Sequence, residues 1–287
     1  MNPFFWGLGS ALGWGTADFV ARLSGRAVGP ISSVFGMLLT GSLLLTLWIV
    51  FSGTQLIWVS DGYVWVGLAG LATAAGTWLL YASLSRGPVS VASPAVATFP
   101  VFIVLFGLVL GIVPKAEEWA GMVIIMIGVW VVARASHGEV DQTVAGRGGI
   151  WLTVVYGIGC SAVMASALLF GREATVHYGE VQTTWLIRLC AFGALVVYMI
   201  AMRVRLTLPW RWWPAVSSQG GLDTLGWITF LIGGVGAGAP LTAVGAAPLT
   251  VVTVLLAGIF LREPIPLPQW IGILMVVAGG GVLAYFG

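Results

Sequence analysis

Residues 31–51 read ISSVFGMLLTGSLLLTLWIVF, a stretch with no charged side chain. A bilayer has a hydrocarbon core about 30 Å thick, which a helix crosses with about 20 apolar residues. The stretch therefore predicts a membrane-spanning helix. The rest of the chain has the same character, because 59% of its residues are hydrophobic and only 8% are charged. A soluble domain carries roughly 25% charged residues, so a water-exposed globule is excluded.

Glycine and proline breaks divide the chain into similar apolar segments. We place about ten membrane helices near residues 4–23, 31–51, 63–85, 89–111, 117–134, 149–171, 181–203, 213–235, 240–261 and 268–286. Residues 1–5 lack a basic segment, so we expect a first membrane helix there rather than a cleaved signal peptide. The sequence thus predicts an all-α polytopic protein of the cell (inner or plasma) membrane.

The two halves of the sequence resemble each other at a nearly fixed offset. Residues 87–133 align without a gap on residues 238–284, which pairs Gly121 with Gly272 and Gly128 with Gly279. A similar offset pairs Arg22 with Arg172 near the start of each half. We therefore divide the chain into a first five-helix repeat (1–134), a polar connecting loop (135–148) and a second five-helix repeat (149–287).

An odd number of helices in each repeat has a topological consequence. The second copy must enter the membrane from the side opposite to the first, so the repeats are inverted. Inverted repeats are a recurring construction of secondary transporters, in which they open a central site alternately to each side.

Several motifs resemble the EamA-type repeat of the drug/metabolite transporter superfamily. Residues 81–94 (YASLSRGPVSVASP) and 99–102 (FPVF) look like its last helices in the first half, and residues 246–250 (AAPLT) and 261–272 (LREPIPLPQWIG) do so in the second. The first half departs from the pattern, because Ile112 stands where Glu263 stands in the second half. The resemblance implies a ten-helix exporter or importer of amino acids, sugars, nucleotides or drug-like molecules, with a cavity between the halves.

Three ionisable residues fall inside predicted spans, where each costs roughly 2.5–3.5 kcal/mol to insert. Asp223 lies among small residues and is predicted to face a cavity, the alternative being that it caps a helix starting at Thr224. Arg188 lies deep in its span and would be balanced by a substrate carboxylate or by Asp223. Asp18 lies four residues before Arg22, so it either pairs with Arg22 or faces the substrate.

Aromatic residues well inside the spans complete the predicted substrate-binding set, although ordinary core packing is the alternative for each. The full set is Trp14, Asp18, Trp78, Tyr81, Trp185, Arg188, Asp223 and Trp227. Prolines within the fourth and ninth spans interrupt helical hydrogen bonding and are predicted gating positions: Pro94, Pro100 and Pro248.

No catalytic or metal-binding pattern is present in the sequence. His137 and His177 fall in predicted loops, Cys160 and Cys190 read as packing residues, and neither HExxH nor GxSxG occurs. The net charge of +2 is spread over short loops, which argues against nucleic acid as a partner. We expect no enzyme activity, no cofactor and no metal.

The sequence therefore favours a secondary active transporter that exports small amphipathic metabolites, such as amino acids, by alternating access. Alternatives are a hydrophobic-cation drug exporter, a translocator of lipids or lipid-linked sugars, and a channel. Expected partners are a small-molecule substrate, membrane lipid and a coupling proton carried by Asp223, in a monomer or homodimer. Arginine is concentrated in alternate loops, and the opposite side holds only Lys115 and Arg172, so both termini are predicted outside the cytoplasm.

Overall fold

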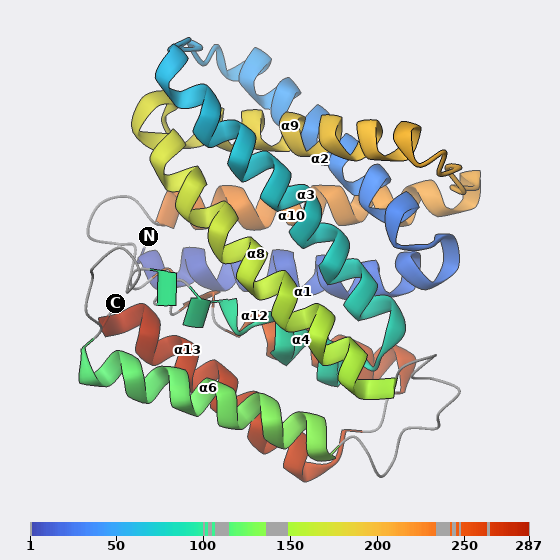
Figure 1. Ribbon diagram of the computed structural model, residues 1–287, viewed down its shortest axis with the longest axis vertical. Coiled ribbons are helices and arrows are strands. Elements are labelled where there is room, and N and C mark those ends of the chain that lie inside the picture. The colour runs from blue at the N-terminus through green and yellow to red at the C-terminus, as the bar shows by residue number, and fades with distance from the viewer. Residues whose placement is uncertain are drawn as a thin grey trace.

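The computed structural model describes residues 2–99, 101–102, 105–106, 115–135, 149–233, 242, 245–246, 248–262 and 265–286. Helices that cross one another at moderate angles make up most of this part of the chain (Figure 1). They are α1 (Pro3–Val28), α2 (Pro30–Ser52), α3 (Tyr63–Arg86), α4 (Val89–Val96), α6 (Ala116–Ala135), α8 (Gly149–Tyr178), α9 (Glu180–Ala201), α10 (Trp213–Gly233), α12 (Leu249–Leu256) and α13 (Leu267–Phe286). Short 3₁₀ turns, η1 (Ser60–Gly62) and η2 (Trp210–Trp212), precede α3 and α10, and a π-helical turn, η4 (Ala257–Leu261), extends α12.

The all-α prediction is confirmed for these described residues, and most predicted boundaries lie within a few residues of the observed ones. The clearest difference is α8, which continues past the predicted end at residue 171 to Tyr178. Between Gly171 and Gly179 no glycine or proline interrupts the helix, and the φ of 70° at Gly179 starts the turn into α9. His177 therefore lies in the last turn of α8 and not in a loop, whereas His137 is outside the described residues.

Four helical segments are long and apolar enough to cross a bilayer, namely Pro30–Ser52, Ser60–Arg86, Gly149–Tyr178 and Glu180–Ala201. Shorter apolar helices lie at Trp119–Val132, Leu249–Leu261 and Leu267–Leu283. The predicted spans 89–111 and 240–261 are described only in part, and the connecting loop is described only at Ala135. The count of ten spans and the division into repeats stay predictions.

Three long helix pairs organise the packing: α1 lies along α10, α3 along α8, and α6 along α13 (Figure 1). Glycines let the backbones approach closely, as membrane helices without large interface side chains do. A Cβ on Gly13 of α1 would lie only 2.9 Å from the backbone nitrogen of Gly226 in α10. Close packing of these pairs therefore depends on the absence of side chains at the crossing points.

The α6–α13 pair makes the same contact twice. A Cβ on Gly128 would lie 2.7 Å from the carbonyl oxygen of Gly272, and one on Gly272 would lie 2.6 Å from the carbonyl oxygen of Gly128. Gly121 and Gly279 are related in the same way, at 3.1 and 2.7 Å. The two helices thus touch through their backbones at two reciprocal points.

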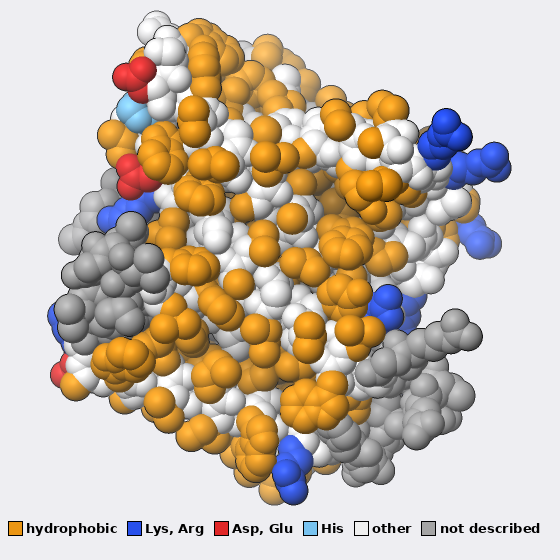
Figure 2. All heavy atoms as spheres, viewed as in Figure 1, with side chains coloured by type: hydrophobic (Ala, Val, Ile, Leu, Met, Phe, Trp, Pro, Cys, Tyr) orange, Lys and Arg blue, Asp and Glu red, His pale blue; other side chains and the backbone are white. Residues whose placement is uncertain are grey.

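Charged side chains gather at two opposite edges of the molecule, and hydrophobic side chains cover the face between them (Figure 2). One edge carries lysine and arginine, and the opposite edge carries most of the visible acidic side chains together with a histidine (Figure 2). The acidic edge is also where both chain ends and the α8–α9 junction lie (Figure 1). Large side chains such as Trp48, Phe51 and Trp130 are more than half exposed, as lipid-facing residues are.

Candidate functional site

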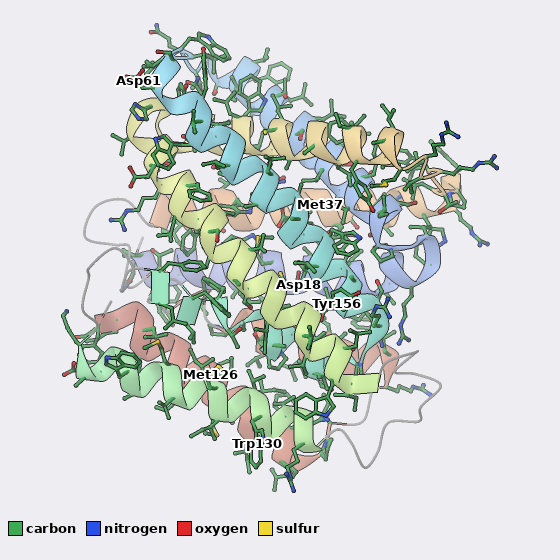
Figure 3. All side chains as sticks on the ribbon, in the orientation of Figure 1. Asp18, Met37, Asp61, Met126, Trp130 and Tyr156 are labelled. Carbon is green, nitrogen blue, oxygen red and sulfur yellow. The ribbon has the colours of Figure 1, made fainter. Side chains whose placement is uncertain are left out.

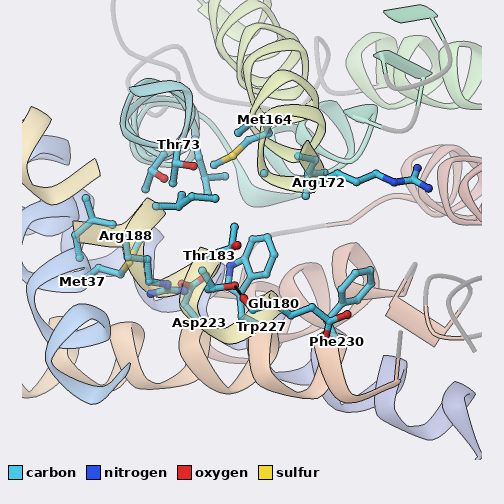
Figure 4. Close-up of a pocket in the computed structure, with 18 of the residues that line it drawn as sticks. Met37, Thr73, Met164, Arg172, Glu180, Thr183, Arg188, Asp223, Trp227 and Phe230 are labelled. Atoms are coloured by element: carbon cyan, nitrogen blue, oxygen red, sulfur yellow. Dashed lines mark hydrogen bonds and ion pairs between the residues drawn. The ribbon is translucent and has the colours of Figure 1, made fainter. Parts of the chain in front are cut away.

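A cavity of about 770 Å³ lies inside the bundle and is lined from α1, α2, α3, α8, α9 and α10 (Figure 4). Its walls are mostly apolar or hydroxyl-bearing, from Met37, Leu38 and Leu80 to Thr73, Thr77, Thr183 and Thr184. Five charged side chains also line it: Asp18, Arg172, Glu180, Arg188 and Asp223. A volume of this size accommodates a small organic solute.

Arg188 and Asp223 form an ion pair across the cavity wall (Figure 4). The Nη2 of Arg188 donates to Oδ2 of Asp223, and its Nη1 donates to the hydroxyl of Thr224 at 3.4 Å. Gly41 on α2 leaves room for the guanidinium, because a Cβ there would collide with Nη1. Asp223 itself balances Arg188, which was one of the two alternatives that the sequence left open.

The structure also shows where in its helix Asp223 lies. α10 begins at Trp213 and continues to Gly233, so Asp223 lies near the middle of the helix. The alternative that Asp223 caps a helix starting at Thr224 is therefore wrong.

Asp18 lies on α1 near the centre of the bundle and lines the cavity (Figure 3). The predicted alternative of a pair with Arg22 is wrong, because Arg22 donates from Nη1 to the carbonyl oxygens of Leu84 at 2.8 Å and Ser85 at 3.4 Å. α1 continues past Arg22 to Val28, so the arginine lies against the end of α3. Within the described residues, the carboxylate of Asp18 has neither an ion-pair nor a hydrogen-bond partner.

The predicted aromatic residues divide between the cavity and the packing behind it. Tyr81 and Trp227 line the cavity. Trp14 packs behind Trp227 with ring centroids 5.4 Å apart, Trp78 packs edge-on against Tyr156, and Trp185 donates to the hydroxyl of Thr46 at 2.9 Å. Substrate contact by Trp14, Trp78 and Trp185 stays a prediction.

Two of the predicted gating prolines, Pro94 and Pro248, are not among the residues that line the cavity. Pro94 is buried inside α4, and Pro248 is the N-cap residue of α12. Pro100 is outside the described residues. A gating role for these three positions stays a prediction.

Sequence reasoning missed Thr183, Arg172 and Glu180. Thr183 is 3% exposed, and its hydroxyl has no hydrogen-bond partner among the described residues. A helical signal was available for Glu180, because Glu180, Thr184 and Arg188 follow one another at intervals of four residues and so share one face of α9. Arg172 was assigned to a loop because the predicted sixth helix ended too early.

The two ends of the cavity differ. Arg172, Val176 and Glu180 are solvent-exposed where α8 and α9 meet, so the cavity reaches the acidic edge. At the other end, the hydroxyl of Ser24 donates to Oε1 of Gln219 at 3.0 Å, and Gln219 donates to the hydroxyl of Tyr81. This network joins α1, α3 and α10 below the cavity.

The apolar helices, the lipid-facing aromatic residues and the internal polar cavity define a multi-pass membrane protein. Residues 1–134 match the model of the EamA-like transporter family. The sequence resemblance is confirmed over these residues. Members of that family are transporters.

Solved structures share the fold over almost the whole chain. One, titled "Crystal structure of protein", superposes with a TM-score of 0.65 at 17% sequence identity and covers 98% of this chain and 95% of its own. At this level of identity the likeness establishes the fold alone. Comparison with curated protein sequences gives no match.

Proposed function

We propose that the protein is a secondary active transporter that moves small amphipathic metabolites, amino acids and related solutes, by alternating access. The observation that carries the proposal is a cavity with exposed residues at one end and a buried hydrogen-bond network, which includes the lining residue Tyr81, at the other. A carrier in one of its two states has this arrangement, whereas an open channel is continuous. No nucleotide-binding motif is present in the sequence, so a solute or proton gradient would drive transport.

The helix pairs support the two inverted repeats on which such a mechanism depends. Exchange of the predicted repeats turns α1 into α8 and α3 into α10, so it converts the α1–α10 pair into the α8–α3 pair. It also exchanges Gly121 with Gly272 and Gly128 with Gly279, which converts each α6–α13 contact into the other. A pseudo-two-fold relation of this kind would let the two halves exchange conformations.

Loop charge supports an outward-facing orientation of the cavity. The cavity opens at the edge that is poor in lysine and arginine, and the positive-inside rule places that edge away from the cytoplasm (Figure 2). The state described here would then be outward-facing, the state in which an exporter releases its solute.

Counterflow in proteoliposomes tests the proposal. Liposomes preloaded with unlabelled phenylalanine or 2-phenylethylamine should transiently accumulate the labelled compound, because a carrier exchanges solute across its two states. Ala167→Trp, which fills the cavity from a buried position, should abolish counterflow, whereas Leu189→Trp on the lipid-exposed side should not. Non-saturable flux without counterflow would indicate a channel, and a co-purifying ligand with acyl chains would indicate lipid translocation.

A further inference from the structure

One carboxylate in the cavity has no partner in the described part of the chain. Asp18 lines the wall, and no donor of those residues lies within hydrogen-bonding distance of it. A carboxylate inside a membrane bundle is costly unless a counter-charge or donors compensate it. Its presence at the centre of the bundle therefore points to a ligand that supplies the missing charge.

The other charged side chains of the cavity do not supply the counter-charge that Asp18 lacks. Arg188 is 4% exposed and is held by Asp223 and Thr224, so its positive charge is already compensated. Arg172 and Glu180 lie at the solvent-exposed mouth, where water and salt screen them. Because the single deep cation, Arg188, is held by Asp223, Asp18 has no counter-charge among the described residues that line the inner cavity.

The surroundings of Asp18 suit an organic cation. Trp14, one helical turn before Asp18 on α1, packs on Trp227, and Asp18 and Trp227 both line the cavity. Aromatic faces attract ammonium groups, more strongly where water is excluded. The free hydroxyl of buried Thr183 is an additional acceptor in the same cavity.

We propose that the cavity binds amphipathic amines through Asp18, and that it prefers a monocationic amine to the zwitterionic amino acid of the same shape. The substrate class rests on the proposed transport function. The ammonium group pairs with Asp18, and the apolar body lies against Trp227, Phe230 and the methionine and leucine side chains of the wall. A carboxylate on the solute finds no free deep cation, because Asp223 occupies Arg188.

Three compounds that share a phenylethyl body test the proposal: 2-phenylethylamine, phenylalanine and 3-phenylpropionate. Their binding to the purified protein in lipid nanodiscs is measured by isothermal titration calorimetry. We expect 2-phenylethylamine to bind tightest and 3-phenylpropionate weakest. Asp18→Asn, which keeps the shape of the side chain, should weaken amine binding by about tenfold or more and remove the preference.

The matched control is Glu173→Gln, which removes one carboxylate from an exposed position of α8 outside the cavity lining and should leave the preference unchanged. Size-exclusion profiles show whether each variant is folded. Equal or tighter binding of phenylalanine or 3-phenylpropionate, a preference that survives Asp18→Asn, or binding of none of the three would each overturn the amine site. Amine binding without counterflow would instead overturn the transport function and leave the site standing.

Discussion

The α6–α13 crossing gives the sharpest test of the packing, because four glycines form it and each lies against a backbone oxygen of the partner helix. In Gly272→Ala, the new Cβ would lie 2.6 Å from the carbonyl oxygen of Gly128 and 3.1 Å from the backbone nitrogen of Val132. Both neighbours are backbone atoms, so the helices must separate. Overpacking of this kind costs about 1–3 kcal/mol, while replacing a helical glycine by alanine gains roughly 0.5–1 kcal/mol.

We therefore expect Gly272→Ala to lower the midpoint of thermal unfolding of the purified protein in detergent. Gly281→Ala, on the same helix, is the matched control, because no atom lies within 4 Å of its new Cβ and only the helix-propensity gain remains. Gly128→Ala should destabilise the Gly272→Ala protein less than it destabilises the wild type, since one separation of the helices accommodates both methyl groups. A Gly272→Ala protein as stable as Gly281→Ala would refute the backbone contact.

Three further predictions concern the cavity and the topology. Gly41→Ala places a Cβ against the guanidinium of Arg188, so counterflow should fall severalfold, whereas Gly193→Ala on α9, where no atom lies within 4 Å, should retain wild-type counterflow. Asp223→Asn removes the partner of Arg188, which then becomes available to a carboxylate of the solute. The binding affinity of phenylalanine should therefore rise relative to that of 2-phenylethylamine in competition calorimetry. An unchanged ratio of the two affinities would contradict the charge assignment. A C-terminal fluorescent reporter that matures only in the cytoplasm should stay dark, and fluorescence would reverse the orientation.

Helix positions were predictable from sequence because apolar length and the glycine and proline breaks act locally. The positions of the glycine breaks also explain why two predicted helix ends were wrong. Gly29 and Gly179 are the positive-φ residues at which α1 and α8 end, and the prediction ended both helices one or two turns too early. Polar residues such as Arg26 and Arg172 were read as loop residues, although a helix continues through them.

The candidate site was predictable in many of its members but only partly in its pairings: the sequence offered Asp223 as one of two partners for Arg188 and Arg22 as one alternative for Asp18. The cost of charge in a membrane singled out Asp18, Arg188 and Asp223, and all three line the cavity. Helical spacing within one segment suggested that Asp18 pairs with Arg22, whereas the observed ion pair joins α9 to α10. Pairing between helices depends on their crossing points, which glycines such as Gly41 determine and which no single segment reveals.

The repeat-related arginines give a prediction about the second state of the carrier. Arg22 is 1% exposed and bonds to the end of α3 at the closed end, whereas its predicted equivalent, Arg172, is exposed at the open mouth. If the repeats exchange conformations, Arg172 should bind the C-terminal end of α10, the equivalent of α3, when the mouth closes. Arg22→Ala should then favour the inward-facing state, and Arg172→Ala should favour the outward-facing state.

Cysteine accessibility measures this difference. Thr183→Cys, combined with Cys160→Ala and Cys190→Ala, places one thiol in the cavity for labelling by a membrane-impermeant maleimide. Relative to this background, Arg22→Ala should raise labelling from the cytoplasmic side, because it removes the contacts to Leu84 and Ser85. Arg172→Ala should raise labelling from the opposite side. The same direction of change in both variants would contradict an exchange of conformations between the repeats, since equivalent arginines would then not close opposite ends.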